Sequence, residues 1–536
     1  MLKTLISFGA LLWLSAFALS QAEPFGVLLE PIEIADLGGL QSFAFGQHDG
    51  KWLIVGGRLD GLHRRQPFAA FDVVGNNNML IVVDPIQQQK WSMSISALPV
   101  EISEQLSSTN MEFHQEGDYL YLIGGYGFNE STSSRITFDK LTAIHVPLVM
   151  EAIINQTSLD GLFRQITDSE FAVTGGHLKK INTTFYLLAG NKFDGNYNPM
   201  GNPTYTQTYT NAIKRFNLTD DGTNITIEHL PSLIDEEHLH RRDYNATSQI
   251  LPNGDEGISI FSGVFQPNIN LPYLNSVTVD DAGYSVVPDF EQYYNHYHCA
   301  VMPVYSETNN EMHSIFFGGI AQYYDSLGIL VQDDNVPFVK TIARVTRYAD
   351  NGMLEYKLPI EMPNYMGAGS EFIALETISH YVNGVIKLDD LTSDTTHVGY
   401  IYGGINSTAP NIFFTNTGSQ SSASNTIFKV SIFTNQTSGT SSLNTRHNEV
   451  LKMRVFPNPN QGQFEITFRL DKPEIVTLSI VDEAGKKIDQ VQIKNLKKGD
   501  NTIPYNLKTS NPKGHYFVII ETPDQKAISK VIIAAE

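Results

Sequence analysis

Short apolar runs that end in glycine recur along most of the chain. Each run is mostly apolar and closes with one glycine or a pair, and successive glycine markers are 56 to 85 residues apart. Runs of this kind, bounded by turn-forming residues, are typical of strands buried on both faces. Their repetition predicts an array of similar β units. The six runs are Trp52–Gly57, Tyr121–Gly125, Phe185–Gly190, Ile258–Gly263, Ile315–Gly319 and Tyr400–Gly404.

A second marker, an apolar residue followed by proline, lies 21 to 41 residues after a glycine marker. A strand-like run such as Met79–Asp84 or Ala212–Asn217 separates the two markers, and another such as Ser42–Phe45 or Glu170–Thr174 precedes the glycine run. Each unit should therefore contain four strands, a to d, with glycine ending strand b and proline ending strand d. Six such units predict an all-β fold, a six-bladed β-propeller over residues 23–434. The proline markers are Leu98-Pro99, Val146-Pro147, Leu230-Pro231, Val287-Pro288 and Leu358-Pro359.

The last unit lacks one strand. It ends with a c-type strand, Thr426–Phe433, and no proline-marked d strand follows. The N-terminal run Val27–Ile34 precedes the first unit and is a spare strand. We expect this strand to complete the last blade, because the pairing would remove an exposed sheet edge and join the two ends of the domain.

The glycine pair after an apolar b strand, together with Trp91 in the expected d strand of the first unit, resembles the Kelch-repeat family. The resemblance spans roughly Gly26 to Asn435. It implies a Kelch-type β-propeller. The units exceed the family's usual period of about 50 residues, and long inserted loops would explain this excess. Several units also lack the tryptophan.

The C-terminal part of the chain has a different pattern. Residues 435–450 are polar and read as a flexible linker. In residues 451–536, short alternating strands are separated by turn signals, which predicts a small β-sandwich. The expected strands are Phe464–Phe468, Val476–Val481, Tyr516–Ile520 and Ile528–Ile533.

Several motifs of this segment occur in the same order as in the C-terminal sorting domain of Bacteroidetes type IX secretion cargo, which the segment resembles. The resemblance implies recognition by the type IX secretion machinery and a secreted or outer-membrane surface location, with release or attachment to surface lipopolysaccharide. The matching residues taken as the sorting signal are Pro457, Asn458, Pro459, Gly462, Gly485, Gly514, Tyr516 and Lys530.

The N-terminus and the composition agree with export. Lys3, an apolar stretch over Leu5–Leu19 and small residues at Ser20–Ala22 predict a signal peptide over residues 1–22. Residues 23–450 carry 22 Lys and Arg against 47 Asp and Glu, so the body should repel phosphate backbones, and nucleic acid is not an expected partner. Cys299 is the only cysteine, which excludes an intramolecular disulfide.

Candidate ligand-binding residues occur on the expected b–c and d–a loops. These loops emerge on one face of a propeller because successive strands reverse direction, and here they are the long ones. Cations there could hold carboxylates, and aromatic planes could hold sugar rings. Kelch propellers place arginines at the start of strand a to hold acidic ligands, and Arg242 fits that position. The candidates are Arg58, His63, Arg64, His240, Arg242, Tyr294, Tyr297 and Tyr323.

Two histidine pairs, His238 with His240 and His296 with His298, raise the question of a metal site near Asp235. Surface histidines are the simpler interpretation, and we expect no metal and no cofactor. Tyr294, Tyr297, His296, His298 and Cys299 are also the residue types of a copper radical oxidase of the galactose-oxidase kind, but that family's flanking pattern is absent. No nucleophile elbow, zinc-protease, Walker or dinucleotide motif occurs, so no catalytic residue is assigned.

Three functions remain compatible with these patterns. The first is an exported or cell-surface propeller that binds a glycan or protein ligand on its long-loop face without catalysis. The second is an exported carbohydrate-active enzyme, such as a sugar epimerase, lyase or oxidase, that uses the channel mouth. The third is a structural component of a surface layer. We expect the first.

Overall fold

The computed structural model describes residues 24–433, except 67–68, 199, 201–203 and 327–328, and residues 453–533, except 458–459, 471, 483–486, 495, 508–513 and 523–525. The chain forms two compact units, residues 25–435 and residues 436–536 with the first 24. The expected signal peptide and linker lie outside the described residues. No helix in the described part of the chain is long and apolar enough to cross a membrane.

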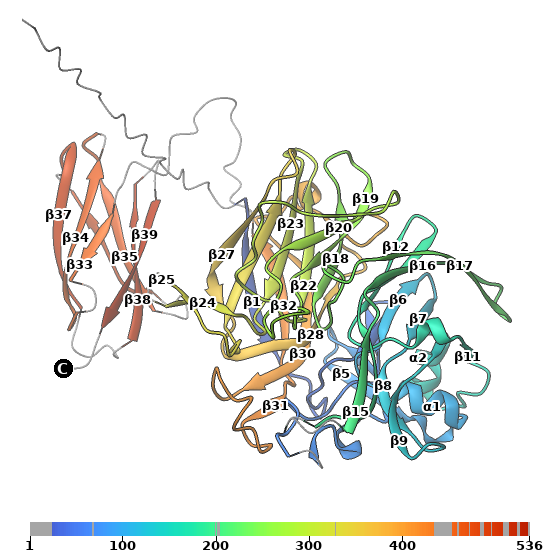
Figure 1. Cartoon of the computed structure of the whole chain (residues 1–536). Helices are drawn as coiled ribbons and strands as arrows, with labels where there is room; N and C mark the ends of the chain where they lie inside the picture. Colours follow the sequence, from blue (N-terminus) through green and yellow to red (C-terminus); the bar gives the residue numbers. More distant parts are fainter. Residues whose placement is uncertain are drawn as a thin grey trace, which may run out of the picture. The chain divides into compact units, whose positions relative to one another are not determined.

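The larger unit consists of six sheets, each built around a four-stranded antiparallel meander (Figure 1). Sheet 1 contains β2 (Ala44–His48), β3 (Lys51–Val55), β4 (Met79–Asp84) and β5 (Gln89–Ser94). Sheet 2 contains β6 (Glu112–Glu116), β7 (Tyr119–Ile123), β10 (Lys140–His145) and β11 (Phe163–Thr167). Sheet 3 contains β12 (His177–Ile181), β13 (Thr184–Leu188), β16 (Ala212–Asp220) and β17 (Ile225–Ile234).

The remaining three sheets follow the same order. Sheet 4 contains β18 (Asn245–Ile250), β19 (Glu256–Phe261), β20 (Ser276–Val279) and β21 (Tyr284–Val286). Sheet 5 contains β22 (Val301–Ser306), β23 (Glu311–Phe317), β26 (Thr341–Arg347) and β27 (Met353–Glu361), with β29 (Ile386–Lys387) parallel to β22. Sheet 6 contains β28 (Tyr365–Ala374), β30 (Thr395–Ser407), β32 (Ile427–Phe433) and β1 (Gly26–Ile32), with β31 (Ser421–Ala423) beside β30.

A closed circle of backbone hydrogen bonds, here called the axial ring, joins the six sheets. One residue at or just before the inner strand of each sheet donates its N–H to the carbonyl oxygen of its counterpart in the preceding sheet, with N···O distances of 2.8 to 3.3 Å. The N–H of Ser42 donates to the carbonyl of Gly369, which closes the circle from the first sheet to the last. The arrangement is therefore propeller-like. The six residues are Ser42, Asn110, Gly175, Asp243, His298 and Gly369.

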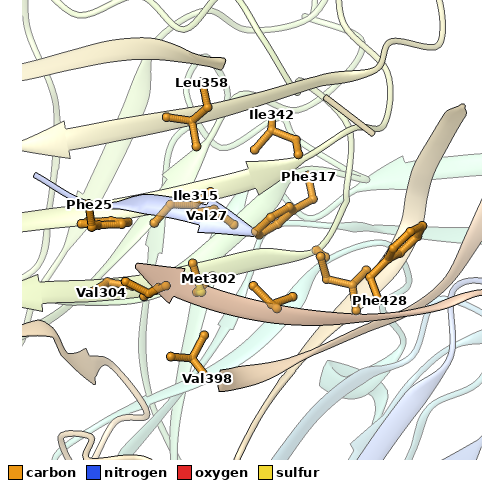
Figure 2. Close-up of a cluster of buried hydrophobic side chains, with 14 of the residues drawn as sticks. Phe25, Val27, Met302, Val304, Ile315, Phe317, Ile342, Leu358, Val398 and Phe428 are labelled. Carbon is orange, nitrogen blue, oxygen red and sulfur yellow. The ribbon is translucent and has the colours of Figure 1, made fainter. Parts of the chain in front are cut away.

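The N-terminal strand completes sheet 6, as predicted. β1 pairs antiparallel with β32 from Gly26 opposite Phe433 to Ile32 opposite Ile427. Its inward side chains enter the apolar core between sheets 5 and 6, where Phe25 and Val27 are 3% exposed (Figure 2). Burial of these apolar side chains stabilises the junction of the two chain ends.

The glycine markers have a structural cause. Gly56 and Gly57, at the end of β3, have φ of 63° and 85°, a region that favours glycine. A Cβ on Gly57 would also lie 2.7 Å from the carbonyl oxygen of Gln41. Glycine is therefore required where strand b ends against the inner strand.

Two details of the predicted strand order are wrong. Val146-Pro147 does not end a d strand but begins α2 (Val146–Asn155), because proline fits the first helical turn; the d strand β11 follows the helix. The expected a strand Glu170–Thr174 is instead a short 3-10 helix and a turn, and strand a is β12. Pro231 and Pro359 lie inside β17 and β27, outer strands with a free edge that tolerate a missing N–H.

Three b–c loops carry small hairpins. They are β8 (Tyr126–Asn129) with β9 (Ser134–Thr137), β14 (Asn191–Asn196) with β15 (Thr204–Tyr209), and β24 (Tyr323–Ser326) with β25 (Ile329–Gln332). The sheet 2 and sheet 3 hairpins join side by side, because the Thr137 hydroxyl donates to the Phe193 carbonyl at 2.8 Å. Between β5 and β6 the chain forms α1 (Val100–Leu106).

The smaller unit is a β-sandwich. One sheet contains β33 (Arg454–Phe456), β34 (Gln463–Leu470) and β37 (Gly499–Asn506), and the other contains β36 (Lys487–Ile493), β35 (Val476–Asp482), β38 (Gly514–Glu521) and β39 (Lys526–Ile533). Alternate residues such as Phe464, Ile466 and Phe468 point into the shared core. All four predicted strands lie within observed ones.

Candidate functional site

A cavity of about 140 Å³, here called the chamber, lies on the axis of the larger unit. The inner strands of all six sheets line it, starting from the residues of the axial ring. Its walls combine apolar side chains, such as Phe45 and Phe113, with a set of titratable groups. The acidic and basic residues among them are Glu112, His177, Lys179, Asp243, His298 and Glu371.

His298 and Glu371 form an ion pair in the chamber, with Nε2 and Oε1 3.1 Å apart. Burial lowers the pKa of His298, but the carboxylate of Glu371 outweighs that effect and raises the pKa above its usual value. The ring of His177 lies 5.2 Å from that of His298, and its Nε2 is 2.8 Å from the Tyr244 carbonyl oxygen. Burial, followed by the charges of His298 and Lys179, holds the pKa of His177 well below normal. The chamber thus favours one protonated and one neutral imidazole.

Glu112 is a nearly buried carboxyl group, 1% exposed, on the chamber wall. Its Oε1 accepts a hydrogen bond from the Gly176 N–H at 2.8 Å, whereas its Oε2 has no hydrogen-bond partner in the described structure. Burial raises the pKa of Glu112 well above its usual range. The neutral acid is therefore the favoured form.

Arg242 is the centre of a second cluster, here called the mouth, directly before the ring residue Asp243. Its Nε donates to the Tyr209 hydroxyl at 3.0 Å, its guanidinium lies 4.7 Å from the Phe265 ring centroid, and Nη1 is 3.7 Å from the Asp243 carboxylate. No hydrogen bond from either Nη atom to another described residue is found. Most of the donor fork is therefore available to a ligand.

Aromatic side chains from four loops lie near enough to Arg242 to contact it or to respond to its charge. The His63 ring lies 4.7 Å from the Tyr197 ring, and Tyr209 stacks on His240 at 3.6 Å. The hydroxyl of Tyr297 interacts with Asp243, and the charge of Arg242 acts on it. The same charge acts on His63 and Tyr197. The mouth is defined as His63, Tyr197, Tyr209, His240, Arg242 and Tyr297.

Four of the eight predicted ligand-binding residues, His63, His240, Arg242 and Tyr297, therefore lie together. Burial lowers the pKa of His63 to about 4, and its Nδ1 has no hydrogen-bond partner in the described structure. Burial, then the charge of Arg242, also lowers the pKa of His240. Both imidazoles are neutral at physiological pH and act as rings and hydrogen-bonding groups rather than as cations.

Arg58 is placed differently from Arg242. It is 3% exposed, and its guanidinium forms a two-point pair with Asp60, with Nε to Oδ1 at 2.7 Å. It also donates to the Asn76 side chain at 2.7 Å and to the Asp72 carbonyl at 3.0 Å. Arg58 thus ties the sheet 1 loop together.

Arg64, Tyr294 and Tyr323 lie apart from the mouth contacts. Arg64 packs against Gly418 of a sheet 6 loop, where an added Cβ would be 2.6 Å from its Nε. The backbone N–H of Tyr294 donates to Glu355 at 3.2 Å, and Tyr323 contacts Tyr293 with ring centroids 5.1 Å apart. Their binding roles remain sequence predictions without a shared site.

The histidine pairs do not converge. His238 contacts Asp235 at 2.9 Å, whereas His240 contacts Asn211 at 2.9 Å. His296 is buried between the Gln292 carbonyl and the Gln322 N–H. In the described ranges no group of three or more His, Cys, Asp or Glu side chains is placed to hold a metal ion. Cys299 is buried in an apolar cluster with Phe261 and Phe316, which contains no tyrosine.

Sequence reasoning did not identify Tyr197 and Tyr209 of the mouth as site residues. Of the six acidic and basic residues of the chamber it considered only His298, and that one as a metal ligand. A partial signal exists for the chamber, because each of its titratable residues lies within four positions of an axial-ring residue. This spacing could be used only if the positions of the axial-ring residues were known, and those positions depend on where each inner strand begins.

Some residues of the expected sorting signal have clear structural roles. Gly462 has φ of 98°, and its N–H donates to the Asn460 side chain at 2.7 Å. Tyr516 is 3% exposed in the sandwich core. Pro457 follows β33, Gly514 begins β38 and Lys530 lies in β39. Asn458, Pro459 and Gly485 lie outside the described residues.

Residues 454–534 match the family model described as a secretion system C-terminal sorting domain. This segment is a type IX sorting domain, so the protein interacts with the type IX secretion machinery and is secreted or displayed at the outer-membrane surface.

Comparison with solved structures also found matches. One is the structure of YjhT, 10% identical, which covers 75% of this chain and 99% of that chain at a TM-score of 0.39. Another is a glycoside hydrolase family 43 arabinoxylan arabinofuranohydrolase from Bacillus subtilis in complex with cellotetraose, 10% identical, covering 93% of this chain and 95% of that chain at a TM-score of 0.28. No curated protein matches the sequence.

Proposed function

We propose that the larger unit is a six-bladed Kelch-type β-propeller and that it binds a glycan on its long-loop face. Support for the fold comes from the six meander sheets, the axial ring and the closing pair of β1 with β32. The paired glycines with positive φ at the end of strand b agree with the Kelch pattern.

The single observation that carries the binding proposal is Arg242 among the aromatic rings of the mouth. Its Nη atoms make no hydrogen bond to the described residues, and its nearest carboxylate is 3.7 Å away. Tyr197, Tyr209 and Tyr297 offer ring faces and hydroxyl groups from neighbouring loops. A guanidinium beside aromatic planes suits a sugar that carries a carboxylate, because the fork binds the acid and the rings stack on the pyranose.

The test is a glycan array followed by calorimetry on the mature protein, Arg242→Met and Arg215→Met. Arg215 is a matched control on β16, bonded to the Pro231 carbonyl at 2.9 Å. We expect acidic glycans to bind the parent and the control, and Arg242→Met to weaken binding at least tenfold, or about 1.4 kcal/mol. Binding that survives Arg242→Met would refute this face, and capture of a protein ligand alone would replace the glycan.

The alternative, an exported sugar epimerase, lyase or oxidase, is favoured by a separate observation. The chamber places a protonated imidazole, His298, and a neutral one, His177, with ring centroids 5.2 Å apart, and environments that separate two pKa values in this way suit acid–base chemistry. Mass spectrometry of each bound glycan after incubation tests it. An altered glycan whose conversion stops in His298→Ala would make the protein an enzyme.

A further inference from the structure

Lys179 is a basic residue of the chamber wall that has no ionic partner among the described residues, and burial lowers the pKa of its amine. It lies on inner strand β12, and no carboxylate of the described chain lies within 4.0 Å of its ammonium group. The next residue, Lys180, is by contrast ion-paired with Glu116 and lies over the Phe185 ring at 5.1 Å. Adjacent strand residues point to opposite faces, which explains why only one of the two lysines finds a partner.

Lys179 lines the chamber together with Glu371 and both histidines. The charge of Glu371 acts to raise the pKa of Lys179, and the charge of Lys179 acts to lower the pKa values of His298 and His177. Glu371 belongs to sheet 6 and Lys179 to sheet 3, which are three sheets apart in a ring of six and therefore on opposite sides. The space between them is the chamber.

The other charges around the chamber are matched. Glu371 pairs with His298 at 3.1 Å, and Asp243 pairs with Arg242 at 3.7 Å. Glu112 favours its neutral form because burial raises its pKa. Lys179 is then the one basic group among these residues without an ion pair in the described structure. An unpaired charge taken from water is costly, so an anionic partner would be stabilising there.

We propose that the chamber binds a small carboxylate anion of two to four carbons, held by the ammonium group of Lys179 and the imidazole of His298. The size follows from the volume, because a cavity of about 150 Å³ accommodates a molecule such as benzene, with six heavy atoms. None of the mouth residues lines the chamber, so this anion site is distinct from the glycan site proposed around Arg242.

The test is calorimetric titration of the mature protein with acetate and lactate, and with acetamide and lactamide, at constant chloride in a carboxylate-free buffer. We expect the two anions to bind and the neutral amides to bind at least tenfold more weakly. Lys179→Met should lose at least tenfold in anion affinity, whereas Lys180→Met, which removes the paired neighbour, should retain it. Equal binding of anions and amides, or unchanged anion binding in Lys179→Met, would overturn the proposal.

A second measurement needs no variant. Reductive methylation of the parent protein, followed by peptide mass spectrometry, should show Lys179 protected by lactate but not by lactamide, while Lys180 reacts equally in both. Equal reaction of Lys179 in the two solutions would also refute the site. Neither experiment uses a glycan, so failure of glycan binding at Arg242 leaves these outcomes unaffected.

Discussion

Arg241 and Arg242 are neighbours in sequence but belong to two different regions. Arg241 belongs to a set of contacting residues, here called the seam, with His238, Ser262, Tyr273 and Asn275, and Arg242 belongs to the mouth. Arg241 is 0% exposed, donates to the backbone carbonyls of His238, Ser262 and Asn275, and stacks on Tyr273 at 4.1 Å. Among the described residues, the Arg242 side chain makes one hydrogen bond, to Tyr209, and one ion pair, to Asp243. A loop arginine is structural when protein acceptors use its donors, and available for a ligand when they do not.

The largest expected effect therefore belongs to Arg241. We expect Arg241→Ala to lower the free energy of unfolding by about 3 kcal/mol or more, because it leaves buried carbonyls without donors and opens a cavity beside Tyr273. Urea denaturation measures the change. Arg242→Met, the matched variant of the neighbouring residue, should lie within about 1 kcal/mol of the parent, since the partly exposed Arg242 side chain makes one hydrogen bond to the described residues and methionine keeps its apolar packing. Equal losses in both variants would remove the distinction between seam and mouth.

Arg58 tests whether a predicted binding residue is structural. Its two-point pair with Asp60 and its bond to Asn76 are local to one loop. We expect Arg58→Met to cost about 1 to 2 kcal/mol in urea denaturation, the loss of charge-assisted hydrogen bonds at a nearly buried site. Its glycan affinity should stay within a factor of three of the parent. A tenfold loss of affinity without a loss of stability would instead place Arg58 among the ligand contacts.

Most of the architecture could be predicted from the local pattern of apolar residues, glycine and proline in the sequence. Apolar runs ending in glycine located the b strands because strand burial and positive φ are properties of short segments, as Gly56 and Gly57 illustrate. Counting strands showed that the last unit lacks strand d, and this count alone identified β1 as the strand that takes its place beside β32. Pro147 was assigned wrongly because proline occurs both where strands end and where helices begin, and only the packing of α2 distinguishes the two cases.

The candidate site residues could be predicted only in part, and Arg58 and Arg242 show why. Both stand in long loops with carboxylates nearby in sequence, yet Asp60 pairs closely with one, and Asp243 lies 3.7 Å from the other. The chamber was harder still, because Lys179 and Glu371 are far apart in sequence and are brought to one cavity by closure of the ring. The local sequence pattern does not show which distant residues the closed ring brings together.

The smallest expected effect concerns pH and the pair of His298 with Glu371. The folded-state pKa of His298 is raised above its usual value of 6.5, so its stabilisation is present below pH 6.5 and is lost as the pH rises through the folded-state pKa. Glu371→Gln should therefore cost about 1 kcal/mol in urea denaturation at pH 5.5 and less at pH 9. Asp243, Lys179 and His177 also face this pair and contribute to its electrostatics. The control is therefore Glu236→Gln, which removes the charge of an exposed carboxylate in the loop between β17 and β18. A cost for Glu371→Gln that is equal at both pH values, or larger at pH 9, would show that His298 is not held protonated by this carboxylate, and would remove one of the two cationic groups assigned to the chamber.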